Sequence, residues 1–267
     1  MAFTLQKVER LFGRKTMKLG QYIHYIMNYK KTSTWGKRNS KTFVSYLRAN
    51  GIKVGENVKF RFPKSTTIDI SRPSLVEIGS NLDINANFTI MTHDFGTYVF
   101  RNAFHNYVSS SGRVKIGSNI YFGRDVTILK GVTIGDNCII GIGSVVTHDI
   151  PSNSVAVGNP CRVICSLEDY YQKRIEKQVI EALDLGCSII ENMKREPKIT
   201  DFKEEWVLFL TEDDITNHPE IMPEVNSRVG LIKDDFFLNR KLFFNGFDEF
   251  LQAIYQRYTL KRLQNNH

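Results

Sequence analysis

The chain has 267 residues and a formal net charge of +8, which is more length than one ordinary domain needs. It contains no run of about 18 apolar residues and no visible signal-peptide pattern, so the sequence predicts neither a membrane-spanning segment nor a cleaved leader. The positive charge is concentrated at the start: residues 1–50 hold eleven Lys or Arg and one acid.

This basic arm, residues 1–50, is predicted to be helical. Its apolar residues roughly share one helical face: Leu5, Val8, Phe12, Leu19, Ile23 and Ile26. Two interpretations stay open. The arm either packs on the open end of a repeat domain as a cap, or contacts anionic lipid or an anionic glycan at the membrane surface. Nucleic-acid binding is not predicted, because basic residues without a recognition motif are weak evidence for it.

Residues 51–165 contain a repeat of six residues. Gly directly follows several of its large apolar members, which are Ile116, Phe122, Ile128, Ile134, Ile140 and Val146. Ile78, Ile84 and Ile90 show the same spacing, and Val54 is an earlier, looser member. Neither an amphipathic helix nor an isolated strand has this period. It is typical of a solenoid with three flat faces, whose coils must stack because one coil cannot bury its own face.

The spacing breaks between Ile90 and Ile116, because this 26-residue interval is not a multiple of six. We therefore expect a loop near residues 92–112 to be extruded from the solenoid. The loop begins with His93 and Asp94 and contains His105 and several aromatic residues. Loops that leave a rigid scaffold often carry function.

Residues 166–267 are predicted to be mostly helical. Apolar residues recur every three or four positions from Tyr171 to Met193, and Pro197 is expected to follow the end of that helix. A second apolar and aromatic cluster runs from Phe236 to Tyr258. Such a stripe is more often core than a cofactor site. The segment is therefore interpreted as a small subdomain covering the other end or outer face of the coil, with a role in acceptor choice left open.

The repeat resembles the hexapeptide-repeat acyltransferases, which fold as left-handed parallel β-helices. The resemblance covers roughly residues 53–165 and is most specific in the late segment GSVVTHDIPSNSVAVGNPCRVI. Within the family, the branch of galactoside, maltose, xenobiotic and capsular-polysaccharide O-acetyltransferases is most similar. The resemblance implies a mainly β protein: a left-handed parallel β-helix with an N-terminal helical arm and a C-terminal helical subdomain. It also implies a homotrimer with sites between subunits.

The family uses a His general base just before the extruded loop, and His93 occupies the matching position. Imidazole suits this role because its pKa lies near neutral pH. The resemblance implies direct acetyl transfer from acetyl-CoA, without an acyl-enzyme. An acid or a backbone carbonyl would hold the other ring nitrogen, and Asp94 is one candidate.

Positions that match the family's acetyl-CoA contacts lie on the late coils: Gly123, Arg124, Ile142, Thr147 and Arg162. The N–H of Arg124 matches the oxyanion donor, and the guanidinium of Arg162 suits the nucleotide phosphates. The weaker candidates for contact with the acceptor are Asn85, Asn87, Asp94 and His105. No metal is predicted, because no His pair five residues apart and no paired Cys spacing is present.

These features predict an acetyl-CoA-dependent O-acetyltransferase that acts on a sugar hydroxyl, as in a bacterial capsular or lipopolysaccharide glycan. An N-acetyltransferase of an amino sugar, an antibiotic-inactivating acetyltransferase and a catalytically inert scaffold are the alternatives. Free thiols and the missing leader predict a cytoplasmic protein. The basic arm leaves contact with the inner face of the membrane open.

Overall fold

The computed structural model describes residues 36–230, 237 and 240–265. It divides into two compact units, Met1–Tyr170 and Tyr171–His267, and each unit is described by itself. The helical face expected between residues 5 and 26 lies outside the described residues. Helices hold more of the described residues than strands do, so the predicted class "mainly β" is not confirmed.

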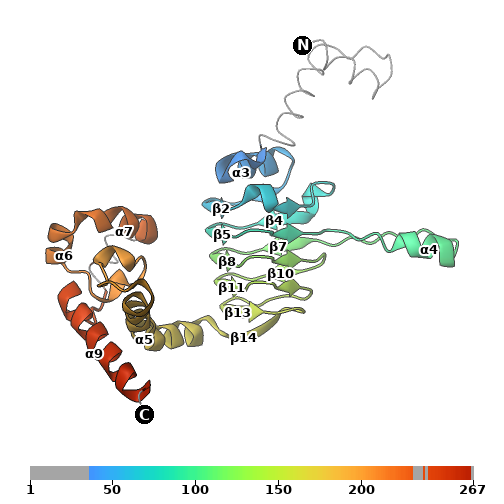
Figure 1. Ribbon diagram of the computed structural model, residues 1–267. Helices are drawn as coiled ribbons and strands as arrows, with labels where there is room; N and C mark the ends of the chain where they lie inside the picture. Colours follow the sequence, from blue (N-terminus) through green and yellow to red (C-terminus); the bar gives the residue numbers. More distant parts are fainter. Residues whose placement is uncertain (1–35, 231–236, 238–239, 266–267) are drawn as a thin grey trace, which may run out of the picture. The chain divides into compact units, whose positions relative to one another are not determined.

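The first unit is a three-sided parallel β-helix (Figure 1). One sheet contains β1 (Lys53–Val54), β4 (Val76–Ile78), β7 (Val114–Ile116) and β10 (Thr133–Ile134). The second contains β2 (Val58–Phe60), β5 (Leu82–Ile84), β8 (Ile120–Phe122), β11 (Cys138–Ile140), β13 (Ser154–Val157) and β14 (Arg162–Ser166), of which β14 alone pairs antiparallel. The third contains β3 (Thr67–Ile68), β6 (Thr89–Ile90), β9 (Thr127–Ile128) and β12 (Val145–Val146). The left-handed winding stays a prediction.

The six-residue repeat is confirmed as the inward face of these coils. Ile84 and Phe122 are paired neighbours in one sheet, and both are fully buried. Val54 pairs with Ile78, so the looser early repeat is also a true coil. Cys138, expected to be a small core residue, is buried and forms no disulfide. The large inward residues of the stacked coils thus share one continuous buried core.

Asparagines turn one corner of each coil. Asn119 and Asn137 adopt the left-handed conformation, with φ of 58° and 56°. Their side chains form a ladder, in which the Asn119 amide donates to Asn137 at 2.9 Å and Asn137 donates to Asn153 at 2.9 Å. Asn tolerates positive φ better than most residues with a side chain, so it suits the backbone conformation of this turn. The ladder also gives the Asn side-chain amides hydrogen-bond partners.

A short helix closes the first coil. After a 3₁₀ turn, η2 (Gly36–Arg38), helix α3 (Ser40–Ala49) begins at Asn39, whose side chain accepts from the backbone N–H of Thr42 at 2.9 Å. Phe43 and Leu47 of α3 are buried in the same core as the coils. Helix α3 thus covers the first coil, whereas the predicted cap helix with its face between Leu5 and Ile26 lies outside the described residues. Two further 3₁₀ turns, η3 (Pro63–Ser65) and η4 (Pro73–Leu75), lengthen the first coil.

A long loop extends from the solenoid between β6 and β7. It leaves the solenoid after β6 and returns at β7, and it contains helix α4 (Thr97–Ala103). Figure 1 shows α4 standing away from the coils at the end of two extended legs. Phe95, Phe104 and Tyr107 expose 62%, 70% and 67% of their surface, so this loop presents apolar side chains to its surroundings.

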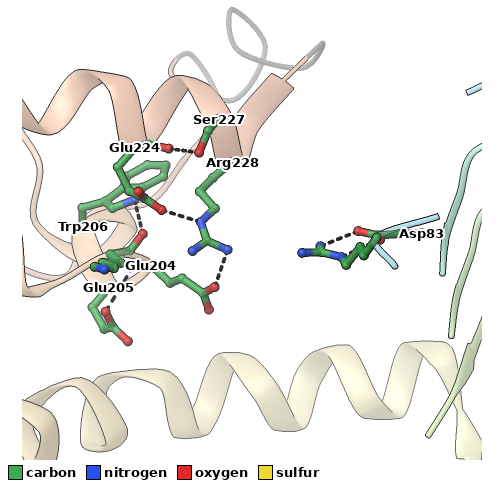
Figure 2. A network of polar contacts seen from close by, with 9 residues as sticks. Asp83, Glu204, Glu205, Trp206, Glu224, Ser227 and Arg228 are labelled. Carbon is green, nitrogen blue, oxygen red and sulfur yellow. Dashed lines mark hydrogen bonds and ion pairs between the residues drawn. The ribbon is translucent and has the colours of Figure 1, made fainter. Parts of the chain in front are cut away.

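The second unit is helical, as predicted. It comprises α5 (Leu167–Met193), η5 (Ile199–Asp201), η6 (Glu205–Leu208), α6 (Glu212–Asn217), η7 (Pro219–Ile221), α7 (Met222–Val229) and α9 (Phe247–Asn265). Trp206, Phe209 and Phe250 lie in its core. Figure 2 shows Arg228 joining Glu204 and Glu224 at 2.7 and 2.9 Å, with the Trp206 Nε1–H donating to the backbone carbonyl of Lys203. None of the helices in the described ranges combines the length and apolarity that a membrane crossing requires.

Helix α5 passes α9 at very short range. A Cβ atom at Gly186 would lie 2.4 Å from Cδ1 and 2.7 Å from Cγ1 of Ile254. Only a residue without a side chain allows this approach. The glycine inside the predicted helix is therefore explained by packing.

Candidate functional site

His93 lies at the point where the extruded loop leaves the solenoid. Its backbone forms a bridge with Ser111 on the returning leg. Its Nδ1 atom lies 2.6 Å from Oδ2 of Asp69, which follows β3 on the preceding coil. The His93 side chain is 28% exposed and that of Asp69 only 6%. The imidazole is thus held by a buried carboxylate and remains partly exposed.

The Asp69 carboxylate is saturated with donors. Oδ1 accepts from the backbone N–H of Ser71 at 2.9 Å and from its hydroxyl at 2.6 Å, and Oδ2 accepts from the Thr92 hydroxyl besides facing His93. Burial by itself raises the pKa of the Asp69 carboxyl. The hydrogen bonds from Ser71, Thr92 and His93 outweigh burial and hold that pKa well below its usual range. Asp69 is therefore ionised at neutral pH and favours a proton on Nδ1 of His93.

Asp94 does not orient His93, so that interpretation is wrong. Its Oδ1 accepts from the backbone N–H of Gly96 at 2.9 Å, and its Oδ2 accepts from the Ser110 hydroxyl at 2.9 Å and contacts Lys130 Nζ. Adjacency in the sequence was misleading because consecutive residues of an extended segment point to opposite sides. Asp69 fills the role expected of an acid.

His105 is not brought to His93 within the chain. It is exposed and has a φ of 50°, and it comes two residues after α4, at the far end of the loop. A further histidine, His148, is also exposed, and its Nδ1 lies 2.8 Å from the Thr147 hydroxyl. Of these three histidines in the described part of the chain, only His93 contacts a buried carboxylate.

Three predicted acetyl-CoA contacts share one corner of the solenoid. Gly123 follows β8, and a Cβ atom there would lie 2.6 Å from the backbone nitrogen of Ile142 on the next coil. The carbonyl of Arg124 accepts from Gly143 at 2.8 Å. The Ile142 side chain is 68% exposed, and Arg124 is exposed beside it. This corner therefore presents an exposed apolar side chain, Ile142, next to a cationic one, Arg124.

Asn85 and Asn87 occupy the same corner one coil earlier, both between β5 and β6 rather than on neighbouring coils. Asn85 Oδ1 accepts from the backbone N–H of Ala86 at 2.8 Å, and Asn87 donates to Asp125 at 2.6 Å. Asn87 also has a φ of 58°. Both side chains thus serve the turn, as Asn commonly does in such coils.

Thr147 and Arg162 lie elsewhere. Thr147 follows β12, at the corner that also carries Asp69 and Lys130. Arg162 begins β14, is exposed, and donates through Nη1 to the carbonyl of Cys161 at 2.8 Å. Its guanidinium is available for a phosphate group.

The two corners are separated by one face of the solenoid. His93 lies after the third sheet and Gly123 before it. The predicted base therefore lies at a different corner from Gly123, Arg124 and Ile142, whereas Thr147 lies at the corner that carries Asp69.

Sequence reasoning missed Asp69, although a signal was present. The pair Thr-Ile occurs four times. Three of these pairs stack in one sheet, which are Thr67-Ile68, Thr89-Ile90 and Thr127-Ile128, whereas Thr133-Ile134 lies in another. When the coils are aligned on this pair, Asp69 stacks one coil before Met91, and His93 follows Met91 by two residues. The signal was hidden because the first stacked pairs are 22 residues apart, whereas Thr127 and Val145 are 18 apart.

Within the described part of the chain, no cluster of three or more His, Cys, Asp or Glu could hold a metal ion.

Comparison with known proteins gives consistent matches. Residues 113–148 match the family model "Bacterial transferase hexapeptide (six repeats)". Protein CapG of Staphylococcus aureus is 35% identical over 158 residues, covering 59% of this chain and 88% of that protein. The galactoside O-acetyltransferase of Escherichia coli (strain K12) is 34% identical over 185 residues, covering 60% of this chain and 86% of that protein.

Among solved structures, the maltose O-acetyltransferase from Clostridium difficile 630 matches with 30% identity and a TM-score of 0.35, covering 55% of this chain and 84% of that one.

Proposed function

Since this chain belongs to the hexapeptide-repeat acetyltransferases, we propose that it moves an acetyl group from acetyl-CoA to a sugar hydroxyl, with His93 as general base. The observation that carries this proposal is the contact between His93 Nδ1 and the buried Asp69 carboxylate. Because Asp69 keeps the proton on Nδ1, the lone pair lies on Nε2, the ring nitrogen that does not face the carboxylate.

In the proposed reaction, Nε2 takes the proton of the acceptor hydroxyl as its oxygen attacks the thioester carbonyl. The C–S bond then breaks, and the leaving thiolate receives that proton from Nε2. Asp69 stabilises the imidazolium that exists between the two steps. The backbone N–H of Arg124 is the proposed donor to the oxyanion, and Ile142, Thr147 and Arg162 are the proposed contacts of the acetyl-CoA molecule.

The separation of the two corners supports a homotrimer. One chain supplies His93 and another supplies the corner of Gly123 and Arg124, so the reacting atoms lie in the groove between two copies. A monomer would hold both halves of the machinery without a complete site.

A surface glycan, capsular or lipopolysaccharide, is the proposed acceptor. Support comes from the relatives named for galactoside and maltose O-acetylation, and from the exposed aromatic side chains of the extruded loop, whose faces can stack on sugar rings.

The test is release of free CoA thiol from acetyl-CoA against oligosaccharides, nucleotide amino sugars and aminoglycoside-like drugs. Wild type is compared with His93→Gln and with the matched exposed-histidine control His148→Gln. Release that depends on a glycan and is lost only in His93→Gln supports the proposal. Release only with amino sugars or drugs identifies an N-acetyltransferase instead, and unchanged release in His93→Gln refutes the assignment of the base.

A further inference from the structure

The two legs of the extruded loop are fastened together at its base. His93 bridges Ser111, and the backbone N–H of Gly112 donates to the carbonyl of Thr92 at 2.9 Å. Beside these contacts, the Ser110 hydroxyl of the returning leg donates to Asp94 of the outgoing leg. The fastening lies immediately next to the candidate base.

Lys130 contacts both legs from the next coil. It follows β9, and its Nζ atom forms an ion pair with Asp94 Oδ2 and donates to the Ser110 hydroxyl. Its side chain is only 31% exposed. One cation therefore links a carboxylate on the outgoing leg to a hydroxyl on the returning leg.

The corner that carries Lys130 is itself closely packed against the loop. Gly131 has a φ of +84°, and a Cβ atom at Gly112 would lie 2.7 Å from the Gly131 nitrogen. The returning leg thus runs directly over this corner, and glycine at 112 is needed for that approach. The Lys130 side chain starts from a fixed point rather than from a mobile turn.

We propose that Lys130 is a positioning residue: by holding Asp94 and Ser110 together, it fixes the direction in which the extruded loop leaves the active site. Asp94 also accepts from Gly96, directly before α4, so the same carboxylate sets the start of the loop helix. The loop carries the proposed acceptor surface. Lys130 therefore acts on acceptor binding through the loop, whereas proton transfer depends on His93 and Asp69. The kinetic part of this inference rests on the proposed function.

Because the ion pair between Lys130 and Asp94 is partly exposed, its loss can change the order of the loop without changing the stability of the whole fold. Asp94 is half exposed, so water can solvate its carboxylate when the lysine is removed. Partly exposed ion pairs contribute little to global stability. Loss of Lys130 is expected to loosen the legs and to leave the buried coils intact.

The experiment compares the full-length wild type with Lys130→Met, which keeps the length of the side chain and removes its charge. Lys130→Arg is the conservative rescue. Lys115→Met, on the exposed face of β7, is the matched control for removal of a lysine from the solenoid. Hydrogen exchange of the peptides over 92–96 and 108–113 is measured without substrate, together with the melting temperature.

In Lys130→Met we expect about tenfold faster exchange of the Gly112 amide, the change that follows from the loss of one charged hydrogen-bonding partner, with little change in melting temperature. The KM for the acceptor should rise by about tenfold, while the KM for acetyl-CoA and the pH profile stay as in wild type. Lys130→Arg should restore most of both effects.

Unchanged exchange at the legs in folded Lys130→Met would overturn the proposal, whatever the activity. Equal losses in kcat and in both KM values, accompanied by a lower melting temperature, would also overturn it, because they indicate a merely structural residue. If exchange rises but no sugar accepts acetyl, the fastening by Lys130 stands and the proposed function fails.

Discussion

Replacement of Asp69 by asparagine is the most direct test of the candidate site. The substitution keeps the shape of the side chain and removes its charge. The backbone N–H of Ser71 can only donate, so the Asn oxygen is expected to stay on that side and the amide NH₂ to face His93. The imidazole must then accept at Nδ1 and carry its proton on Nε2, which is the wrong tautomer for a base that acts through Nε2.

The size of the effect follows from the lost ion pair. Two charges about 4 Å apart interact by about 4 kcal/mol at an effective dielectric constant near 20. His93 is 28% exposed, so solvent screening lowers this contribution to roughly 2–4 kcal/mol. One decade of rate corresponds to about 1.36 kcal/mol, so kcat should fall by about 30-fold to about 1000-fold.

The assay is steady-state thiol release at saturating acetyl-CoA, with kcat measured as a function of pH. Asp83→Asn is the matched control, because Asp83 lies on the outer side of β5 and pairs with Arg61 rather than with a histidine. A folded Asp69→Asn enzyme whose kcat stays within about threefold of wild type would refute the argument that Asp69 sets the tautomer and stabilises the imidazolium.

Three further outcomes are expected. The folded-state pKa of Asp69 lies below the unfolded value of about 3.9, so its ionised form contributes stability that is complete above about pH 4 and is lost as the pH falls towards the folded-state pKa; acid unfolding of Asp69→Asn should therefore be less steep than that of wild type. Gly186→Ala should lower the free energy of unfolding of the C-terminal unit by roughly 1–3 kcal/mol, because the new methyl group meets Ile254; addition of Ile254→Val should recover part of that loss in a denaturant titration. Asn137→Ala should destabilise the β-helix by about 1–2 kcal/mol, since alanine is strained at a φ of 56° and the ladder is broken, whereas Asn137→Gly should cost less; equal losses would show that backbone conformation is not the cause.

The sequence alone determined the solenoid and the place of its loop. The six-residue period is visible in the sequence because each coil repeats the same inward positions and stacks on its neighbours. The burial of Ile84 and Phe122 could therefore be predicted from the repeat alone. The break in the repeat after Ile90 indicated where the loop lies. The helix from Leu167 to Met193 was equally readable from its apolar spacing.

Only the tertiary structure decided which groups meet at His93. Asp69 precedes it by 24 residues, and the two 3₁₀ turns of the first coil shift the register away from the regular repeat. The contacts of Lys130 could not be predicted from the sequence for the same reason. Its partners, Asp94 and Ser110, lie at the two ends of a loop that interrupts the six-residue period. Contacts within a coil follow from residue order. Contacts between coils depend on the length of every insertion between them. Which residues an insertion brings opposite each other is decided only when the coils stack.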